Sequence, residues 1–175
     1  MDTDRPRGSP APQESASASD LLAPEEVLAT LAQLDLESAL AYEAAAGLVS
    51  DPEIRGTLGG FARDHRLHVE ALNGVLETEG EGVLAAREPE HMPLLAGLAR
   101  LSGPIGPEAL ALALLANEQL TNLSYEDALA YEWDAASERM LEGFRADEER
   151  HMRWLSDKHD ELTRAASERQ QSPPA

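Results

Sequence analysis

Histidine and carboxylate side chains recur along this chain at a fixed spacing. Residues 61–68 (FARDHRLH) are matched by residues 144–151 (FRADEERH), so that Phe, Asp and His align at an offset of 83 (151 minus 68). The same offset, with no gap, pairs Asp35 with Glu118. Imidazole and carboxylate groups are common ligands of iron, manganese and zinc. The pattern indicates two helix-pair halves around a metal site.

The spacing also predicts that these groups share helix faces and a common height. Two pairs, His65 with His68 and Glu148 with His151, are three positions apart, so each pair shares one helix face. Asp35 lies 15 residues before Ser50, and His65 lies 13 residues after the next helix begins, which leaves a mismatch of only about 3 Å. We therefore expect six metal ligands to converge in one layer: Asp35, His65, His68, Glu118, Glu148 and His151.

Burial of these carboxylates needs compensation. An unpaired buried carboxylate costs several kcal/mol, and a metal ion would offset that cost. The alternative is a buried polar network without metal, in which the same groups satisfy one another through hydrogen bonds. The residues alone are compatible with both interpretations, a metal site and a metal-free polar network.

Apolar stripes at a spacing of three to four residues predict four long helices. Asp51 is expected to cap the second helix, whose first residue is Pro52. The expected helices run from Pro24 to about Val49, from Pro52 to the Gly80–Gly82 region, from Pro107 to about Trp133, and from a turn near Asp134 to about Ala165.

The connections predict how the helices are arranged. Short turns make the first and second helices, and the third and fourth, antiparallel neighbours. Residues 80–106 are long enough to cross the bundle, and an apolar piece within them could form a short helix over the bundle end (Met92–Leu101). We therefore predict an all-α, antiparallel four-helix bundle over residues 23–165, with one long crossover between helices 2 and 3. Residues 1–22 and 166–175 are expected to be disordered tails.

Composition narrows the classes of partner. The net charge of −19 argues against binding nucleic acid or anionic membranes. There is no cysteine, so any metal must be held by histidine and carboxylate. The N-terminus does not look like a signal peptide, and no apolar run approaches the roughly 18 residues of a membrane span. A cytoplasmic location is the expectation.

With these residues in view, the chain resembles the ferritin-like superfamily of rubrerythrins and bacterioferritins over roughly residues 24–162. That family places one Glu on each of two helices and Glu-x-x-His on each of the other two. Residues 148–151 match Glu-x-x-His, Glu118 matches a lone Glu, and Asp35 stands at the other lone carboxylate position. The resemblance implies a ferritin-like bundle with a di-iron site, in which Glu148 bridges the ions and Asp35 and Glu118 are terminal ligands.

One position departs from the family pattern. His65 stands where the family has the Glu of the second motif, so the ligating carboxylates fall from four to three. An imidazole cannot bridge as a carboxylate does, and two divalent ions would keep an uncompensated charge unless hydroxide, oxide or an outer carboxylate contributes. Asp64 and Asp147 are the nearest such carboxylates. A mononuclear site, or one for zinc or manganese, also fits the residues.

Two functions follow as hypotheses. The first is a metalloprotein that oxidises Fe(II) or reduces peroxide or dioxygen, and no catalytic side chain is singled out. The second is a non-catalytic helical bundle with a structural or vestigial metal site that acts as a scaffold or binds a partner. Iron storage is a third, weaker idea, and association into a homo-oligomer is compatible with either.

Tyr42 and Tyr125 occupy equivalent positions about two turns from the expected site. The favoured interpretation is that each is a core tyrosine whose hydroxyl bonds to a neighbouring part of the chain. The alternative is that each supports a carboxylate ligand or takes part in redox chemistry.

Overall fold

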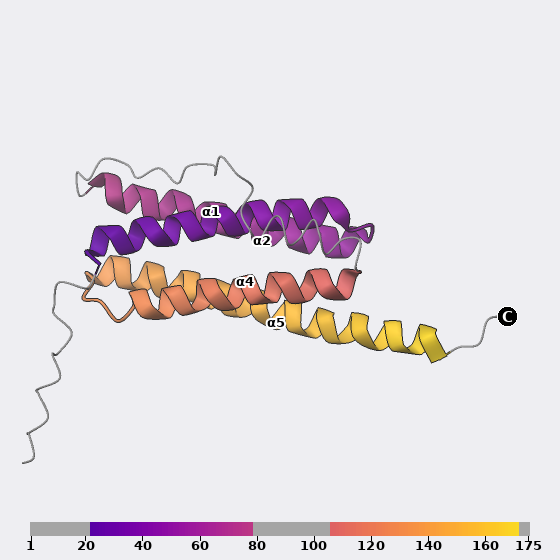
Figure 1. Cartoon of the computed structure of the whole chain (residues 1–175). Coiled ribbons are helices and arrows are strands. Elements are labelled where there is room, and N and C mark those ends of the chain that lie inside the picture. The colour runs from indigo at the N-terminus through magenta and orange to yellow at the C-terminus, as the bar shows by residue number, and fades with distance from the viewer. Residues whose placement is uncertain (1–21, 79–105, 172–175) are drawn as a thin grey trace, which may run out of the picture.

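The computed structural model describes residues 22–78 and 106–171, and within these ranges the regular secondary structure is all helical (Figure 1). The helices are α1 (Pro24–Leu48), α2 (Pro52–Thr78), α4 (Pro107–Ala128) and α5 (Ala135–Gln171). The all-α prediction is confirmed for the described residues. The predicted crossover and its short apolar helix lie outside them.

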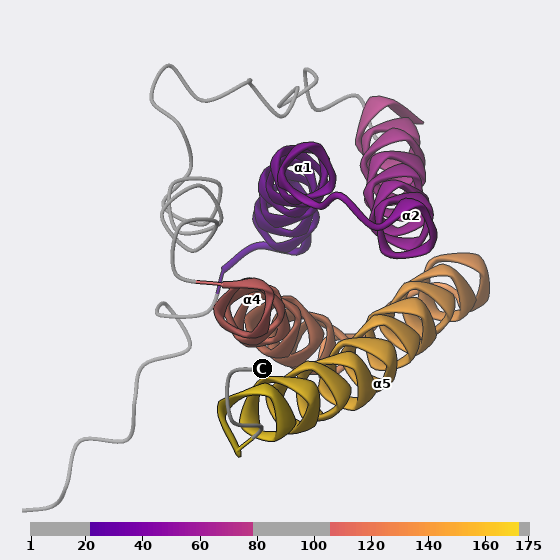
Figure 2. The same ribbon diagram turned by 90° about the vertical axis from the view of Figure 1, so that its right-hand side faces the viewer.

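The helices associate mainly as two consecutive pairs. α1 packs along α2 and α4 packs along α5, while smaller contacts join α1 to α4 and α2 to α5. Figure 2 looks along the bundle and shows these pairs side by side. The short connections at residues 49–51 and 129–134 bring the chain back along the helix it has just left (Figure 1).

Local chemistry explains where two of the helices begin. The Asp51 carboxylate accepts hydrogen bonds from the backbone N–H groups of Glu53 and Ile54, at 2.8 and 3.2 Å. The Asp134 carboxylate does the same for Ala136 and Ser137, at 2.8 and 3.2 Å. Each aspartate therefore satisfies donors that the first helical turn leaves free. The predicted cap at Asp51 is confirmed.

Two helix ends differ from the sequence expectation. α4 ends at Ala128 rather than near Trp133, and the Trp133 indole N–H donates to the Ala128 carbonyl at 2.7 Å, which satisfies an acceptor at the helix end. α5 continues to Gln171, beyond the expected end at Ala165, so residues 166–171 are helical rather than a disordered tail. They contain good helix formers and no glycine or proline, and this part of α5 extends past the other helices (Figure 1).

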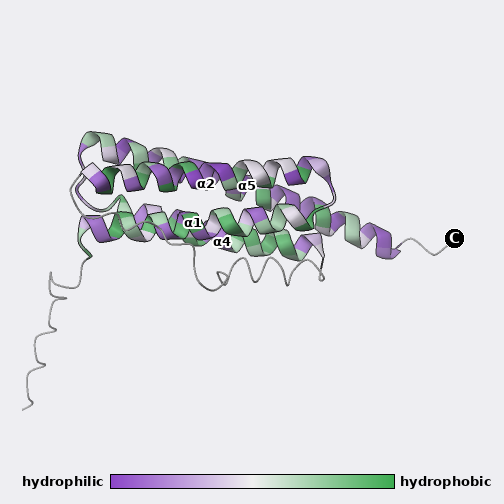
Figure 3. Cartoon of the chain, turned by 90° about the horizontal axis from the view of Figure 1, so that it is seen from above, coloured by the Kyte–Doolittle hydropathy of each residue, from purple (hydrophilic) through white to green (hydrophobic). Residues whose placement is uncertain are grey.

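The core consists of two apolar clusters with a polar layer between them. One cluster lies toward the α1–α2 turn and includes Tyr42, Leu58, Phe61, Leu114 and Leu155. The other lies toward the α4–α5 turn and includes Leu28, Leu31, Leu72, Tyr125 and Leu141. Figure 3 shows hydrophobic residues concentrated in α1 and α4, and more hydrophilic residues along α2 and α5. The polar layer therefore lies between two apolar regions.

In the described ranges, no helix carries a stretch that is both long enough and apolar enough to cross a bilayer.

The Asp51 cap makes a testable contribution to stability. We expect Asp51→Ala to lower the free energy of unfolding by about 1 kcal/mol, because two backbone donors lose their acceptor. Urea unfolding followed by circular dichroism measures the change. Asp51→Ser, which keeps a capping oxygen, is the control, and equal losses in the two variants would contradict the assignment.

Candidate metal centre

The structure brings the six predicted side chains together in the polar layer. All six are buried, with exposed fractions between 0% and 2%. Their ligand atoms form two overlapping groups, and within each group these atoms lie within 4.8 Å of one another. The first group is Asp35, His65, His68 and Glu148, and the second is His65, Glu118, Glu148 and His151. His65 and Glu148 belong to both, so each group has two imidazoles and two carboxylates.

Asp35 is the centre of the first group. Its Oδ1 lies 2.8 Å from His65 Nδ1 and 3.2 Å from His68 Nδ1. Glu148 Oε1 lies 3.4 Å from the same nitrogen of His65 and 3.5 Å from that of His68. Helices α1, α2 and α5 therefore contribute to one set of convergent nitrogen and oxygen atoms.

Glu118 has the equivalent place in the second group. Its Oε1 lies 3.2 Å from His65 Nε2, and its Oε2 lies 3.4 Å from His151 Nδ1. The two ring nitrogens of His65 thus face different groups, Nδ1 toward Asp35 and Nε2 toward Glu118.

Two aspartates bind the outer nitrogens of the other histidines. His68 Nε2 lies 3.4 Å from Asp147 Oδ2, and His151 Nε2 lies 3.2 Å from Asp64 Oδ2. Arg150 donates to both aspartates, at 2.7 and 3.0 Å. A carboxylate on the outer nitrogen fixes the orientation of an imidazole and leaves its inner nitrogen for the centre, which is how metal-ligating histidines are usually held.

The tyrosines contact the carboxylates of the layer directly. The Tyr42 hydroxyl donates to Glu118 and the Tyr125 hydroxyl donates to Asp35, so each bond joins α1 to α4. Both are core tyrosines whose hydroxyls bond to a neighbouring helix, as the favoured interpretation expected, and their partners are carboxylates, as the alternative expected. The sequence placed each tyrosine about two turns from the site, because only the distance along its own helix was considered. The side chain instead reaches across to a carboxylate on the neighbouring helix.

Phenyl rings enclose the outer histidines. Phe144 stacks on His68 and Phe61 lies against His151, each with ring centroids 4.0 Å apart. Both Phe residues belong to the matched segments of the sequence. They place apolar surface beside the imidazoles, which limits the access of water and restricts ring rotation.

Smaller polar residues complete the layer and were given no role from the sequence. Ser38 and Thr121 lie with their hydroxyl oxygens 3.4 Å apart, and the Asn117 amide donates to Ser38 at 2.9 Å. Ser38 and Thr121 stand 83 positions apart. That offset is the signal that could have identified this pair, whereas nothing in the pattern indicated Asn117.

The charges of the six buried side chains compensate one another without a metal ion. Burial by itself would raise the pKa of Asp35 and Glu118, but the histidines outweigh it. Hydrogen bonds from His65 and His68 lower the pKa of Asp35, and the charge of His65 holds the pKa of Glu118 well below its usual range. Burial by itself would lower the pKa of each histidine, but the carboxylates outweigh it. The charges of Glu148 and Glu118 raise the pKa of His65 well above its usual value, and the hydrogen bond to Asp35 raises the pKa of His68 to about 9. The surroundings thus favour the charged forms of Asp35 and Glu118 and of His65 and His68.

Glu148 behaves differently from the other two carboxylates. Burial, reinforced by the charge of Glu118, raises the pKa of Glu148 well above its usual value. Four atoms of the second group are buried without a hydrogen-bond partner among the described residues: both Glu148 carboxylate oxygens, Glu118 Oε2 and His151 Nδ1. Unpaired buried polar atoms are costly and rare in native proteins. Three oxygens and one nitrogen that converge without partners form a donor set that suits a divalent cation.

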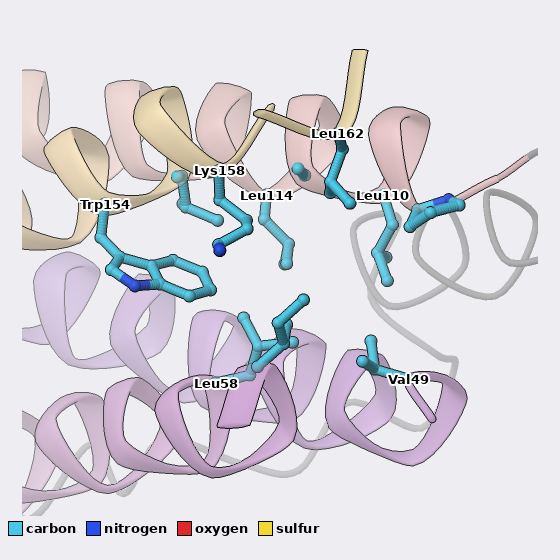
Figure 4. A pocket seen from close by; sticks show the side chains of 11 residues that line it. Val49, Leu58, Leu110, Leu114, Trp154, Lys158 and Leu162 are labelled. Atoms are coloured by element: carbon cyan, nitrogen blue, oxygen red, sulfur yellow. The ribbon is translucent and has the colours of Figure 1, made fainter. Parts of the chain in front are cut away.

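A small apolar cavity lies between the polar layer and the α1–α2 turn. Its volume is about 30 Å³, close to the space of one water molecule, and Figure 4 shows the side chains around it. Leu114 and Leu155 line it, each four positions from a member of the second group, Glu118 and His151 respectively. One helical turn therefore separates the cavity from those residues on both helices.

Comparison of the chain with protein-family models, with curated proteins and with solved structures found no match. The geometry above is therefore the basis for assigning a function.

The charge pairs predict how the stability of the metal-free protein depends on pH. Because the pKa of His68 is raised to about 9, its contribution is complete below about pH 6.5 and is lost as the pH rises through about 9. For protein stripped of metal we expect the free energy of unfolding to fall by a value on the order of 3 kcal/mol across this window, since a shift of one pKa unit corresponds to about 1.4 kcal/mol.

Urea unfolding in the presence of a chelator, between pH 6 and 9.5, measures this loss. His68→Gln removes the titrating group and should flatten the profile. A wild-type profile as flat as that of the variant would contradict the assignment.

Proposed function

We propose that this chain is a ferritin-like metalloprotein whose bundle core binds divalent metal ions. The observation that carries the proposal is the pair of buried, overlapping ligand groups that share His65 and Glu148. The four partnerless atoms of the second group support it, because a cation would satisfy all of them at once. Asp35 and His68 would hold one side of the centre, and Glu118 and His151 the other.

The ferritin-like assignment is supported by the order of the helices and by their motifs. An antiparallel bundle with one long crossover between α2 and α4 would give the family's topology. The contacts also follow the sequence offset. Tyr42 of the first half bonds to Glu118 of the second half, and Tyr125 of the second half bonds to Asp35 of the first. Two halves related by a twofold axis would make such reciprocal contacts. Asp64 with His151 and Asp147 with His68 form a second exchanged pair.

Iron is the metal that best connects this site to an activity, although mixed nitrogen and oxygen ligands suit zinc and manganese as well. Bound iron would supply electrons to dioxygen or to a peroxide. The chain's own residues exclude water, orient the imidazoles through Asp64 and Asp147, and neutralise charge. The apolar cavity one turn away is of a size to admit a diatomic molecule.

A second function is favoured by the compensated charges. Because two imidazolium ions can balance Asp35 and Glu118 without metal, the bundle can fold around this layer with no catalytic purpose. A scaffold or partner-binding bundle with a structural or vestigial metal site would have the same core.

Metal binding by designed variants tests the proposal. We expect wild-type protein that has been stripped of metal with a chelator to take up Zn²⁺, or Fe²⁺ under anaerobic conditions. We expect Glu148→Gln and His151→Gln each to weaken this binding by at least about 100-fold. Glu149→Gln and His159→Gln are matched controls on α5, outside the two groups. Equilibrium dialysis with elemental analysis measures the retained metal.

The same samples separate the two functions. If Fe²⁺-loaded protein is given dioxygen or peroxide, a redox role predicts rapid growth of ferric absorbance that Glu148→Gln lacks. Metal binding with no faster oxidation than in buffer would favour the structural alternative. No metal in wild type, together with higher stability in Glu148→Gln, would refute the metalloprotein and leave a polar network.

The outer aspartates should tune affinity without being ligands. We expect Asp64→Asn and Asp147→Asn each to weaken Zn²⁺ binding by about 10–100-fold, because each variant loses the charge that orients one histidine. Asp157→Asn, an exposed position on α5, is the control. Isothermal titration calorimetry measures the affinities, and unchanged affinity in both variants would contradict this role.

A further inference from the structure

His65 has a position that no other histidine of the layer shares. His68 and His151 each direct one nitrogen inward and bind an aspartate with the other. His65 instead directs both nitrogens into the layer, with Nδ1 2.8 Å from Asp35 and Nε2 3.2 Å from Glu118. Neither nitrogen of His65 has an outer carboxylate among these contacts. The ring therefore lies between the two ligand groups.

His65 is also the counterpart of Glu148. The two positions are separated by the same 83 residues that relate Asp35 to Glu118 and His68 to His151. They are the only residues that belong to both ligand groups of the described chain. One shared position thus offers two oxygens, and the other offers two nitrogens on opposite sides of a rigid ring.

A charge count supports a role for both nitrogens. Ionised Asp35, Glu118 and Glu148 carry three negative charges, whereas two divalent cations carry four positive charges. Among the ligands themselves the sum leaves one positive charge. Asp64 and Asp147 share the charge of Arg150 and are partly exposed, at the rim of the layer. Charge compensation inside the buried layer, where an uncompensated charge is costly, therefore falls to the ligands. An imidazolium ion that has lost both N–H protons becomes an imidazolate with one negative charge, and it would bring the charge sum of the ligands to zero.

We propose that His65 bridges two divalent cations, with Nδ1 bound to the ion held by Asp35 and His68, and Nε2 bound to the ion held by Glu118 and His151. This inference rests on the proposed function. Formation of the bridge sends both N–H protons of an imidazolium to solvent, as metal binding to a protonated ligand requires. Glu148 remains available to both ions through its two oxygens.

The bridge has a measurable geometric consequence. Ions that share a single carboxylate oxygen or a hydroxide lie about 3.5–4 Å apart in two-metal sites. Ions on opposite nitrogens of one ring lie about 6 Å apart, because each metal–nitrogen bond of about 2.0–2.1 Å adds to the width of the ring. The separation of the ions therefore distinguishes the two kinds of bridge.

Crystals of the full chain grown with Zn²⁺ test the proposal through anomalous scattering. Wild type should show two zinc positions about 6 Å apart, with the His65 ring between them. His65→Glu restores a fourth carboxylate and should bring the ions to about 3.5–4 Å. His65→Gln has a single good ligand oxygen and should retain one ion instead of two, as equilibrium dialysis against Zn²⁺ would show.

The outcomes separate this inference from the proposed function. Two ions about 4 Å apart in wild type, or a single ion, would overturn the bridge and leave the metalloprotein standing. Two ions retained by His65→Gln would also overturn it. No bound zinc in wild type would refute the metalloprotein itself. If His65→Gln proves unable to fold by circular dichroism, the zinc separation in wild type still decides.

Discussion

The burial of six ionisable side chains in a dry helical core is the constraint on which this structure depends. Three carboxylates and three imidazoles have essentially no exposed surface, and apolar clusters lie on both sides of them. In such surroundings each charge requires a partner, since desolvation costs several kcal/mol per ion. The remaining polar groups of the layer can be understood as responses to this requirement.

Those partners come from other helices, so the layer also joins the two helix pairs. The larger contacts lie within α1–α2 and α4–α5. Across the pairs, the tyrosine–carboxylate bonds connect α1 with α4, and the histidine–aspartate contacts connect α2 with α5. Directional polar bonds fix register more sharply than apolar packing, which tolerates sliding. The chemistry of the layer therefore aligns all four helices at one height.

Spacing alone predicted which six residues meet, because helix geometry converts residue number into height and face. It did not predict Tyr42 beside Glu118, since the reach of a long side chain to another helix is not encoded in the numbering of its own helix. Nor did it predict the end of α4 at Ala128, where the carbonyl accepts a hydrogen bond from an indole beyond the helix. Asn117 gave no signal at all, because a single amide on a stripe resembles any other polar residue.

Protons and, on the proposed function, metal cations are two sets of partners for the same side chains, and together they would let one core form with or without metal. Imidazolium ions balance Asp35 and Glu118 when protons are bound, and cations would take over that balance when protons leave. Glu148 is the exception, because both of its carboxylate oxygens are buried without a hydrogen-bond partner in the described chain. That residue, rather than the charge-paired aspartate, is where the protein core by itself is least satisfied and where a cation would stabilise it most.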